Sequence, residues 1–326
     1  MKTIRWGIAG SGSIANKFAN CIKNVEGAEL VAVASRSEKT ARDFALKHNI
    51  PNVFEGYDSL ADFPDVDAIY VSTIHPFHKS CAEVFLNAKK HVLCEKPLCV
   101  NAAEAKELAE CARKNGVFLM EAMWTRFLPA IIEAQKYVKS GKIGDVMGIK
   151  ADFCYNCPPN EDPKLYDNTL AGGSLLDVGI YSINFASYFL GLDPESISAV
   201  ADVRNGVDCH TDITFKYPNG AIASLTSAIA LHKPEDAYIY GTKGHIYFPS
   251  FYGAQEFFVN LDSGEKEHIK ALSIGTGFEE EIIECSNCIR EGKTESDIHP
   301  LSDTIKVLKL MDAVREQISL KYPSDK

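Results

Sequence analysis

The sequence predicts an α/β protein of two domains. Residues 1–122 fit a doubly wound parallel sheet, because strand-like and helix-like segments alternate about every 25–30 residues. Residues 123–326 fit an α/β domain with a large, mostly antiparallel open sheet, because short alternating segments separated by tight turns follow Leu192. A chain of 326 residues, of which 46% are hydrophobic, is long enough to bury two cores.

The N-terminal segment carries the first functional motif. Ile4–Ala9 is an apolar run typical of a strand, and a helical pattern begins soon after it. Between the two stands Gly10-Ser11-Gly12-Ser13-Ile14-Ala15, with G-x-G-x-x-A spacing. Gly10 permits the tight turn, Gly12 lets the backbone approach a pyrophosphate, and Ala15 allows close helix–strand packing. In this context the motif predicts a Rossmann domain that binds a dinucleotide; the alternative is a plain β-turn.

The end of the second expected strand, over residues 30–34, bears on the choice of cofactor. NAD-binding domains usually place an acidic residue here to hold the ribose 2′-hydroxyl. This chain has Ser35-Arg36-Ser37 instead. Arg36 can pair with a phosphate or stack on adenine, and no carboxylate repels a 2′-phosphate. The sequence therefore predicts NADP in preference to NAD; the alternative is that Arg36 is only a surface arginine.

Further strands are expected over residues 67–73, 91–94 and 117–120. The first of them ends at Thr73, and the loop after it would run beside the nicotinamide half of the cofactor. His75 and His78 in this loop would either contact the substrate or cap the following helix, and both interpretations stay open.

The strand over residues 91–94 leads into Glu95-Lys96-Pro97, a candidate functional motif. Pro97 ends the strand because it lacks a donor and fixes φ. Lys96 would then lie at the carboxyl edge of a parallel sheet, where open α/β folds bind ligands. An isolated lysine is more often a solvated surface charge, so the interpretation depends on this setting.

The second half begins with a helix near residues 131–138 and a strand over 146–153. Residues 154–172 read as a long loop near the site, and a helix follows it to about Leu190. Asp177 and Tyr181, four residues apart, would share one face of that helix; the alternative is a local structural contact. The remaining expected strands are 196–203, 211–217, 221–230, 237–240, 245–248 and 256–259, with helices near 277–290 and 301–320. A sheet covered by helices on one face could cover the other by forming a homodimer.

Composition excludes several classes of function. The formal net charge is −10 and no lysine- or arginine-rich block occurs, which argues against nucleic acid or an anionic membrane as the partner. No apolar run approaches the ~20 residues of a membrane span, and no signal peptide is evident, so we expect a cytoplasmic protein. The ten cysteines are scattered and read as reduced. Cys154 and Cys157 form a close C-x-x-C pair, and no metal site is expected.

Four stretches together resemble a known family. They are the glycine motif, Glu95-Lys96-Pro97, Glu121-Ala122-Met123-Trp124-Thr125-Arg126-Phe127, and Gly172-Gly173-Ser174-Leu175-Leu176-Asp177-Val178-Gly179-Ile180-Tyr181. The chain resembles Gfo/Idh/MocA-type oxidoreductases, and within them the branch of dimeric dihydrodiol dehydrogenases and NADP-dependent xylose dehydrogenases. Polyol dehydrogenases of the wider family carry histidine where this chain has Tyr181.

The resemblance implies a nicotinamide site between the two domains and dimerisation through the open sheet. It implies that Lys96 and Tyr181 are the catalytic pair, that Asp177 and Arg126 shape the site, and that Trp124 lines the pocket. The expected cofactor-binding residues are Gly10, Ser11, Gly12, Ser13, Ile14, Ala15, Ser35, Arg36, Thr73, His75, His78, Glu95, Lys96, Trp124 and Arg126.

The expected chemistry is hydride transfer between a nicotinamide and a hydroxyl-bearing carbon. A tyrosine with a pKa near ~10 is a poor base, and a neighbouring lysine ammonium favours tyrosinate. Tyr181 would act as the acid/base with Lys96 as its electrostatic partner, while Asp177 accepts a hydrogen bond from a neighbouring hydroxyl or orients Lys96. A sugar, polyol or trans-dihydrodiol would fit. Two alternatives remain: an NAD-dependent, redox-assisted glycoside hydrolase and a non-catalytic dinucleotide-sensing regulator.

Overall fold

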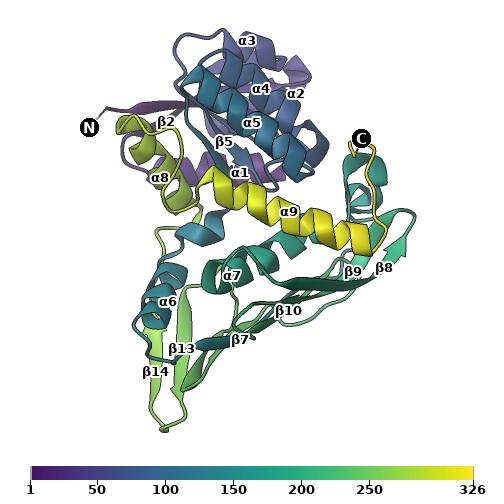
Figure 1. The fold of residues 1–326 in the computed structure, drawn as a ribbon. Coiled ribbons are helices and arrows are strands. Elements are labelled where there is room, and N and C mark those ends of the chain that lie inside the picture. Colours follow the sequence, from purple (N-terminus) through teal and green to yellow (C-terminus); the bar gives the residue numbers. More distant parts are fainter. Residues whose placement is uncertain (1, 326) are drawn as a thin grey trace. The chain divides into compact units, whose positions relative to one another are not determined.

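The computed structural model describes residues 2–325, which form two compact units. The first unit consists of residues up to 99 together with 103–127 and 274–305; the second consists of 100–102, 128–273 and the residues from 306 onward. Figure 1 shows the elements of both units along the chain. The prediction divides the chain once, between residues 122 and 123. The structure instead returns a C-terminal segment, including helix α8 (Phe278–Arg290), to the first unit.

A six-stranded parallel sheet forms the centre of the first unit, in the order β3-β2-β1-β4-β5-β6. The strand order reverses at β1, which lies between β2 and β4, and such a reversal is where open α/β sheets bind ligands. The strands are β1 (Ile4–Ala9), β2 (Ala28–Ser35), β3 (Asn52–Glu55), β4 (Ala68–Val71), β5 (His91–Glu95) and β6 (Leu119–Ala122). Every strand predicted in this half is therefore confirmed, and β3 is an edge strand that the prediction omitted.

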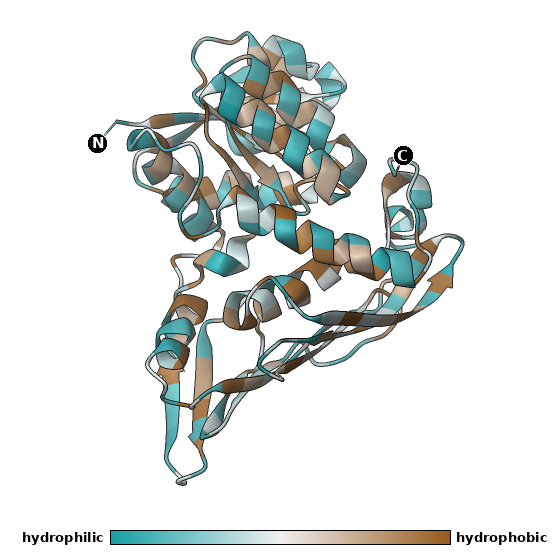
Figure 2. Ribbon diagram, viewed as in Figure 1, coloured by the Kyte–Doolittle hydropathy of each residue, from teal (hydrophilic) through white to brown (hydrophobic). Residues whose placement is uncertain are grey.

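Helices cover this sheet on the pattern expected of amphipathic helices. They are α1 (Ser13–Cys21), α2 (Glu38–His48), α3 (Tyr57–Ala61), α4 (His78–Asn87) and α5 (Ala102–Asn115). Figure 2 shows that α4 and α5 carry both hydrophilic and hydrophobic residues, as helices with one solvent-facing side do. Phe18 of α1 stacks on Tyr70 of β4, with ring centroids 4.0 Å apart. This contact fixes α1 to the sheet directly after the glycine motif.

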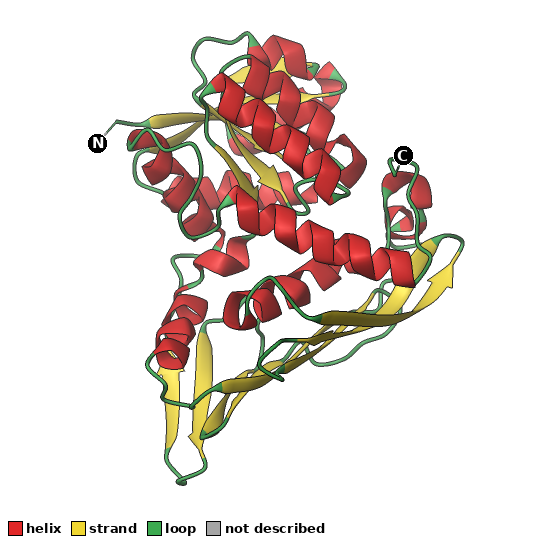
Figure 3. Cartoon of the chain, in the orientation of Figure 1, coloured by secondary structure: helices red, strands yellow, loops and turns green. Residues whose placement is uncertain are grey.

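An eight-stranded sheet dominates the second unit, in the order β14-β13-β12-β11-β7-β10-β9-β8. All neighbouring strands are antiparallel except β7 and β10, which are parallel. The strands are β7 (Val146–Cys154), β8 (Ser196–Arg204), β9 (Val207–Lys216), β10 (Ile222–Ala228), β11 (Ala237–Gly241), β12 (Gly244–Phe248), β13 (Glu256–Leu261) and β14 (Lys266–Lys270). Strands and helices are distinguished by colour in Figure 3. The predicted fold class, a parallel doubly wound sheet followed by a mostly antiparallel one, is confirmed.

The two faces of the large sheet differ in character. The inward face is apolar, with residues such as Ile149, Leu225 and Phe257 fully or almost fully buried. Helix α7 (Ile180–Leu190) packs on this face against β7 and β10. The remaining long helices are α6 (Pro129–Lys139) and α9 (Leu301–Gln317), so the last predicted helix ends three residues earlier than expected.

Candidate active site

The glycine motif forms an open cradle at the carboxyl end of β1. Gly10 has φ +106°, and a Cβ there would stand 2.9 Å from the Ser72 carbonyl oxygen, so this position requires glycine. At Gly12, the N-cap of α1, an added Cβ would meet nothing within 4 Å. Helix α1 has no side-chain cap and no acidic residue in its first turn among the described residues. Its N–H groups and dipole therefore suit a pyrophosphate.

Hydroxyl groups gather at the end of β2, where the ribose of the adenosine half is expected. The Ser35 and Ser11 hydroxyl oxygens lie 3.1 Å apart, and the Thr40 hydroxyl donates to Ser35 at 2.8 Å. Arg36 follows Ser35 and is exposed. The nearest carboxylate along the chain, that of Glu38, accepts hydrogen bonds from Arg42. A cluster of hydroxyls beside an exposed arginine fits a 2′-phosphate, so the residues present suit NADP.

His78 is buried and binds backbone rather than lying open to a ligand. Its Nδ1 lies 2.7 Å from the Pro97 carbonyl oxygen and its Nε2 lies 2.9 Å from the Thr73 carbonyl oxygen. Both ring nitrogens are thus engaged by the loops after β4 and β5, which leaves neither for a direct cofactor or substrate contact. The N-cap residues of η2 (His75–Phe77) and α4 are Ile74 and Phe77, neither with a side-chain cap hydrogen bond among the described residues, and capping by His75 or His78 stays a prediction. His78 links the Thr73 loop to the Lys96 loop, and His75 stays a predicted contact.

Lys96 directly follows β5, at the carboxyl edge of the parallel sheet. The preceding Glu95 is buried; its carboxylate accepts hydrogen bonds from the Tyr70 hydroxyl and, at 3.2 Å, from the Lys96 backbone N–H. Burial raises the pKa of Glu95, although the Tyr70 hydroxyl and the Lys96 charge oppose that change. Glu281 of α8 is fully buried, and burial together with repulsion from Glu95 raises its pKa well above the usual value.

Glu121, at the end of β6, fixes the other side of the same loop. Its Oε1 accepts a hydrogen bond from the Leu98 backbone N–H at 2.9 Å. Its Oε2 lies 3.0 Å from His299 Nε2 and accepts from the Thr304 hydroxyl at 3.1 Å. Burial alone would raise the pKa of Glu121, but the hydrogen bond and charge of His299 and the other donors lower it. Leu98 is two residues beyond Lys96, so this buried anchor restrains the lysine loop.

Trp124 and Arg126 lie in a short helical turn, η3 (Trp124–Phe127), that is buried throughout. The Trp124 ring stacks on Phe278 of α8, with centroids 4.5 Å apart. The Arg126 guanidinium lies 3.8 Å from the Asp303 carboxylate and is 4% exposed. Both predicted residues therefore have fixed partners within the first unit.

In the second unit, Asp177 lies in a π-helical turn, η6 (Leu175–Gly179), that precedes α7. The predicted helix to Leu190 is present, but it begins with this π-helical turn, whose wider spacing alters which residues share a face. The Tyr155 hydroxyl donates to the Asp177 carboxylate at 2.6 Å, and burial together with that charge raises the pKa of Tyr155. Tyr181 is 8% exposed and packs against Phe153, with centroids 5.4 Å apart.

The buried carboxylate of Asp208 holds the residues just before Asp177. Asp208 accepts hydrogen bonds from the Ser174 hydroxyl at 2.7 Å, the Leu175 backbone N–H at 2.8 Å and the Thr211 hydroxyl at 2.9 Å. Gly173 has φ +120°, and a Cβ there would collide with the Asp208 carboxylate. Burial raises the pKa of Asp208 to about 6 despite its hydrogen bonds. Tyr155, Glu121, His299 and Asp208 were not predicted as site residues.

Comparison with known families identifies both halves of the chain. Residues 4–123 match the model of the "Oxidoreductase family, NAD-binding Rossmann fold", and residues 131–247 match the Gfo/Idh/MocA C-terminal domain. A mouse protein named trans-1,2-dihydrobenzene-1,2-diol dehydrogenase is 37% identical over 335 residues, covering 99% of each chain. The chain belongs to the Gfo/Idh/MocA family. This confirms the resemblance, the predicted cofactor class of NADP or NAD, and the prediction of an oxidoreductase.

Other relatives and solved structures match nearly the whole chain. The human protein named trans-1,2-dihydrobenzene-1,2-diol dehydrogenase is 35% identical over 336 residues, again covering 99% of each chain. Among solved structures, an aldose-aldose oxidoreductase from Caulobacter crescentus superposes with a TM-score of 0.89 at 27% identity, covering 98% of each chain. A 3-ketoreductase from Actinomadura kijaniata in complex with NADP and TDP-benzene superposes with a TM-score of 0.85 at 26% identity, covering 97% of this chain and 98% of that one. Within residues 2–325, none of the helices has the length and apolar character that crossing a membrane requires.

Proposed function

We propose that the protein is an NADP-dependent dehydrogenase that oxidises a hydroxyl-bearing carbon of a sugar, polyol or trans-dihydrodiol. One observation carries the proposal. Lys96 is fixed at the carboxyl end of β5, in the same parallel sheet whose β1 ends in the open glycine cradle. A dinucleotide site and a restrained lysine thus share one edge of the sheet, as hydride transfer to a nicotinamide requires. The names of the mouse and human relatives point to the same class of substrate.

The chain's own residues divide the work of binding. The Gly10–Ala15 cradle holds the pyrophosphate at the N-terminus of α1. Ser35 and Arg36 hold the 2′-phosphate, which makes NADP the preferred cofactor over NAD. The expected neighbours of the nicotinamide half are Thr73, His75, Glu95, Lys96, Trp124 and Arg126. When bound, the nicotinamide supplies the acceptor for the hydride.

Lys96, Tyr181 and Asp177 act on the substrate hydroxyl and its proton. Tyr181 acts as the tyrosinate, which the Lys96 ammonium stabilises; it takes the proton and becomes neutral tyrosine, while Lys96 donates a hydrogen bond to the substrate oxygen. Asp177 accepts a hydrogen bond from the neighbouring substrate hydroxyl or orients Lys96. The Tyr155 hydroxyl donates a hydrogen bond to the Asp177 carboxylate and holds it in place. A substrate with two adjacent hydroxyls would use both parts of this arrangement.

The test is an absorbance assay at 340 nm on the purified protein, with NADP or NAD and a panel of aldoses, inositols and trans-diols. We expect reduced cofactor to accumulate with NADP and at least one aldose or diol, and more slowly with NAD. Binding of NADP with no reduction across the panel would overturn the proposal in favour of a dinucleotide sensor. Glycoside cleavage with no net reduction would favour the hydrolase.

We also propose that the chain is a cytoplasmic homodimer, paired through the outward face of its eight-stranded sheet. This face bears a row of aromatic rings across β11 to β14. Tyr238 and Tyr247 have centroids 4.7 Å apart, and Phe258 stacks on His268 at 4.3 Å. On other strands of the same face, Val200 is 70% exposed and Ile222 is 47% exposed. Exposed apolar surface of this kind is typical of protein–protein interfaces.

Sedimentation equilibrium tests the dimer. We expect a mass near twice 35.8 kDa for the wild type. Tyr240→Glu, on the outward face, should shift the mass toward the monomer, whereas Leu46→Glu, at an exposed apolar site on α2, should not. A monomeric wild type, or a dimer indifferent to Tyr240→Glu, would overturn this interface.

A further inference from the structure

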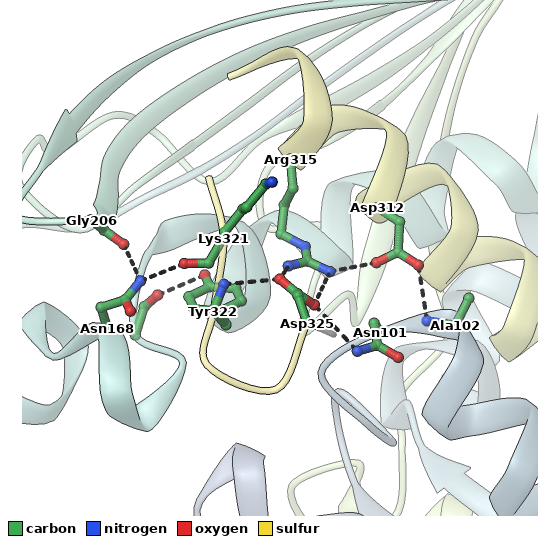
Figure 4. A network of polar contacts seen from close by, with 10 residues as sticks. Asn101, Ala102, Asn168, Gly206, Asp312, Arg315, Lys321, Tyr322 and Asp325 are labelled. Atoms are coloured by element: carbon green, nitrogen blue, oxygen red, sulfur yellow. Dashed lines mark hydrogen bonds and ion pairs between the residues drawn. The ribbon is translucent and has the colours of Figure 1, made fainter. Parts of the chain in front are cut away.

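The C-terminal residues form a folded strap instead of a loose end. We define the C-terminal strap as residues 321–325, which follow α9 and turn back along it. Figure 4 shows the strap and the polar contacts around it. Tyr322 is 3% exposed, and its ring lies beneath the Arg315 guanidinium at 5.1 Å. The last residues of a domain are usually poorly ordered unless specific contacts restrain them, and these contacts restrain the strap.

Arg315 of α9 is the hub that holds the strap. Its guanidinium donates to both carboxylate oxygens of Asp325 and, at 2.6 Å, to Asp312. Asp325 also accepts the Tyr322 backbone N–H at 2.9 Å. The Arg315 side chain is only 5% exposed, and an ion pair in such surroundings is stronger and more restrictive than a pair on the surface. Burial would raise the pKa of Asp325, but Arg315 lowers it, so the pair is charged at neutral pH.

One side of the hub reaches the segment that follows the lysine motif. Asn101 donates to Asp325 at 3.3 Å, and the Ala102 backbone N–H donates to Asp312 at 3.0 Å. These residues come five and six positions after Lys96 and open helix α5. A carboxylate at this place caps the first turn of the helix.

The strap itself reaches the segment that precedes Asp177. The Tyr322 hydroxyl donates to the Gly172 carbonyl oxygen at 2.8 Å in a buried position. Asn168 donates through its side-chain amide to the Lys321 carbonyl oxygen at 2.9 Å and to the Gly206 carbonyl oxygen at 2.6 Å. Gly172 ends the long loop after β7 and stands five residues before Asp177. The strap thus holds the end of this loop on one side, and Asp208 holds Ser174 and Leu175 on the other.

We propose that the C-terminal strap is a positioning element for the segment from Asn168 to Asp177, and that Tyr322 is its positioning residue. This inference rests on the proposed function, in which Asp177 contacts the substrate or orients Lys96. Loss of the Tyr322–Gly172 hydrogen bond frees the backbone close to Asp177. The cost therefore falls on substrate turnover, while cofactor binding by the Gly10–Ala15 cradle is unaffected.

The test compares Tyr322→Phe, which removes only the hydroxyl, with Lys321→Ala as a matched control. Lys321 contributes its backbone carbonyl and exposes its side chain, so the control preserves the contact with Asn168. Three quantities are measured: kcat/KM for the diol or sugar, the dissociation constant of NADP, and deuterium uptake in peptides covering residues 168–177. Tyr322→Phe should lower kcat/KM about fivefold, leave the NADP constant unchanged and speed exchange in those peptides. Lys321→Ala should change none of them.

Asp325→Asn and Asp325→Glu provide a second variant pair. The asparagine should weaken the Arg315 hub and speed exchange over residues 168–177, and the glutamate should restore most of the protection. Unchanged exchange in Tyr322→Phe, an equal effect of Lys321→Ala, or a parallel loss of NADP affinity would overturn the proposal. If the wild type shows no turnover, the proposed function fails, while the exchange comparison still decides whether the strap restrains this segment.

Discussion

In each unit, a buried carboxylate accepts a hydrogen bond from a backbone N–H close to a proposed catalytic residue. The pKa values of these two carboxylates are nevertheless shifted in opposite directions. Glu121 binds the N–H of Leu98, two residues after Lys96, and its pKa is lowered. Asp208 binds the N–H of Leu175, two residues before Asp177, and its pKa is raised to about 6. The difference lies in their partners. Glu121 has the imidazole of His299, whereas the hydrogen bonds to Asp208 within residues 2–325 come from hydroxyl and backbone N–H groups.

This contrast shows what neutral donors can and cannot do for a buried charge. Burial destabilises the charged form of Asp208 by more than its three side-chain hydrogen bonds stabilise it, so the pKa of Asp208 is raised. For Glu121, the hydrogen bonds together with the imidazole of His299 outweigh the effect of burial, so the pKa of Glu121 is lowered. We therefore expect the lysine loop to be stable across neutral pH and the Asp177 segment to be the more sensitive of the two.

Replacing Lys96 should have the largest effect, because its charge serves the chemical step directly. Lys96→Met is expected to lower kcat on the order of 10³-fold. The NADP dissociation constant should stay within about threefold, because the pyrophosphate cradle is untouched. Lys114→Met, an exposed lysine of α5, is the control and should behave as the wild type. Strong residual turnover in Lys96→Met, measured at saturating substrate, would remove Lys96 from the chemistry.

The pH dependence of stability should separate the two carboxylates. The folded chain holds a proton on Asp208 up to about pH 6, whereas the unfolded chain loses it near 3.8. The folded state therefore binds more protons in that window, and the Asp208 contribution to the free energy of unfolding falls as pH rises through it. Relative to Asp208→Asn, the wild type should lose about 2–3 kcal/mol between pH 4 and pH 7.

Glu121 should behave with the opposite sign. Its lowered pKa means that the ionised form stabilises the fold above the ordinary glutamate pKa, and that this stability is lost as pH falls. Urea unfolding of wild type, Asp208→Asn and Glu121→Gln at several pH values measures both slopes. Each slope is the change with pH of the difference in unfolding free energy between the wild type and one variant. Slopes of the same sign for Asp208→Asn and Glu121→Gln would contradict the conclusion that the partners of the two carboxylates set the direction of their pKa shifts.

A smaller effect is expected from Tyr155→Phe. The change removes the hydrogen bond to the Asp177 carboxylate and should lower kcat/KM about tenfold. Tyr166→Phe is the matched control, because its hydroxyl lies in the same loop and donates to the Cys157 carbonyl oxygen. Equal losses in steady-state assays of the two variants would show that loop stability, and not Asp177, is responsible.

The fold was predictable wherever strands are buried or alternate regularly. Strand β3 was missed because none of its four residues is fully buried, and β14 because three of its five residues are lysine or glutamate. Both are edge strands, where solvent replaces the second neighbour and the apolar signal weakens.

The site was predictable only in part, for a related reason. Local motifs indicated the glycine cradle and Lys96, because each depends on neighbours along the chain. The pairs Tyr155–Asp177, Glu121–His299 and Tyr322–Gly172 join residues 22 to 178 positions apart. Such contacts are created by the tertiary fold, so no local pattern could have revealed them. The contacts of the His78 ring with the Thr73 and Pro97 carbonyl oxygens were likewise not evident from the sequence.

The most direct test of the central claim follows the hydride itself. A substrate identified in the panel is deuterated at its hydroxyl-bearing carbon and incubated with the protein and NADP, and the cofactor and product are then analysed by mass spectrometry. We predict that reduced cofactor accumulates with one deuterium per molecule, in equal amount to the oxidised product. Deuterium that stays in or returns to the substrate skeleton, with no net reduced cofactor, would contradict the dehydrogenase assignment.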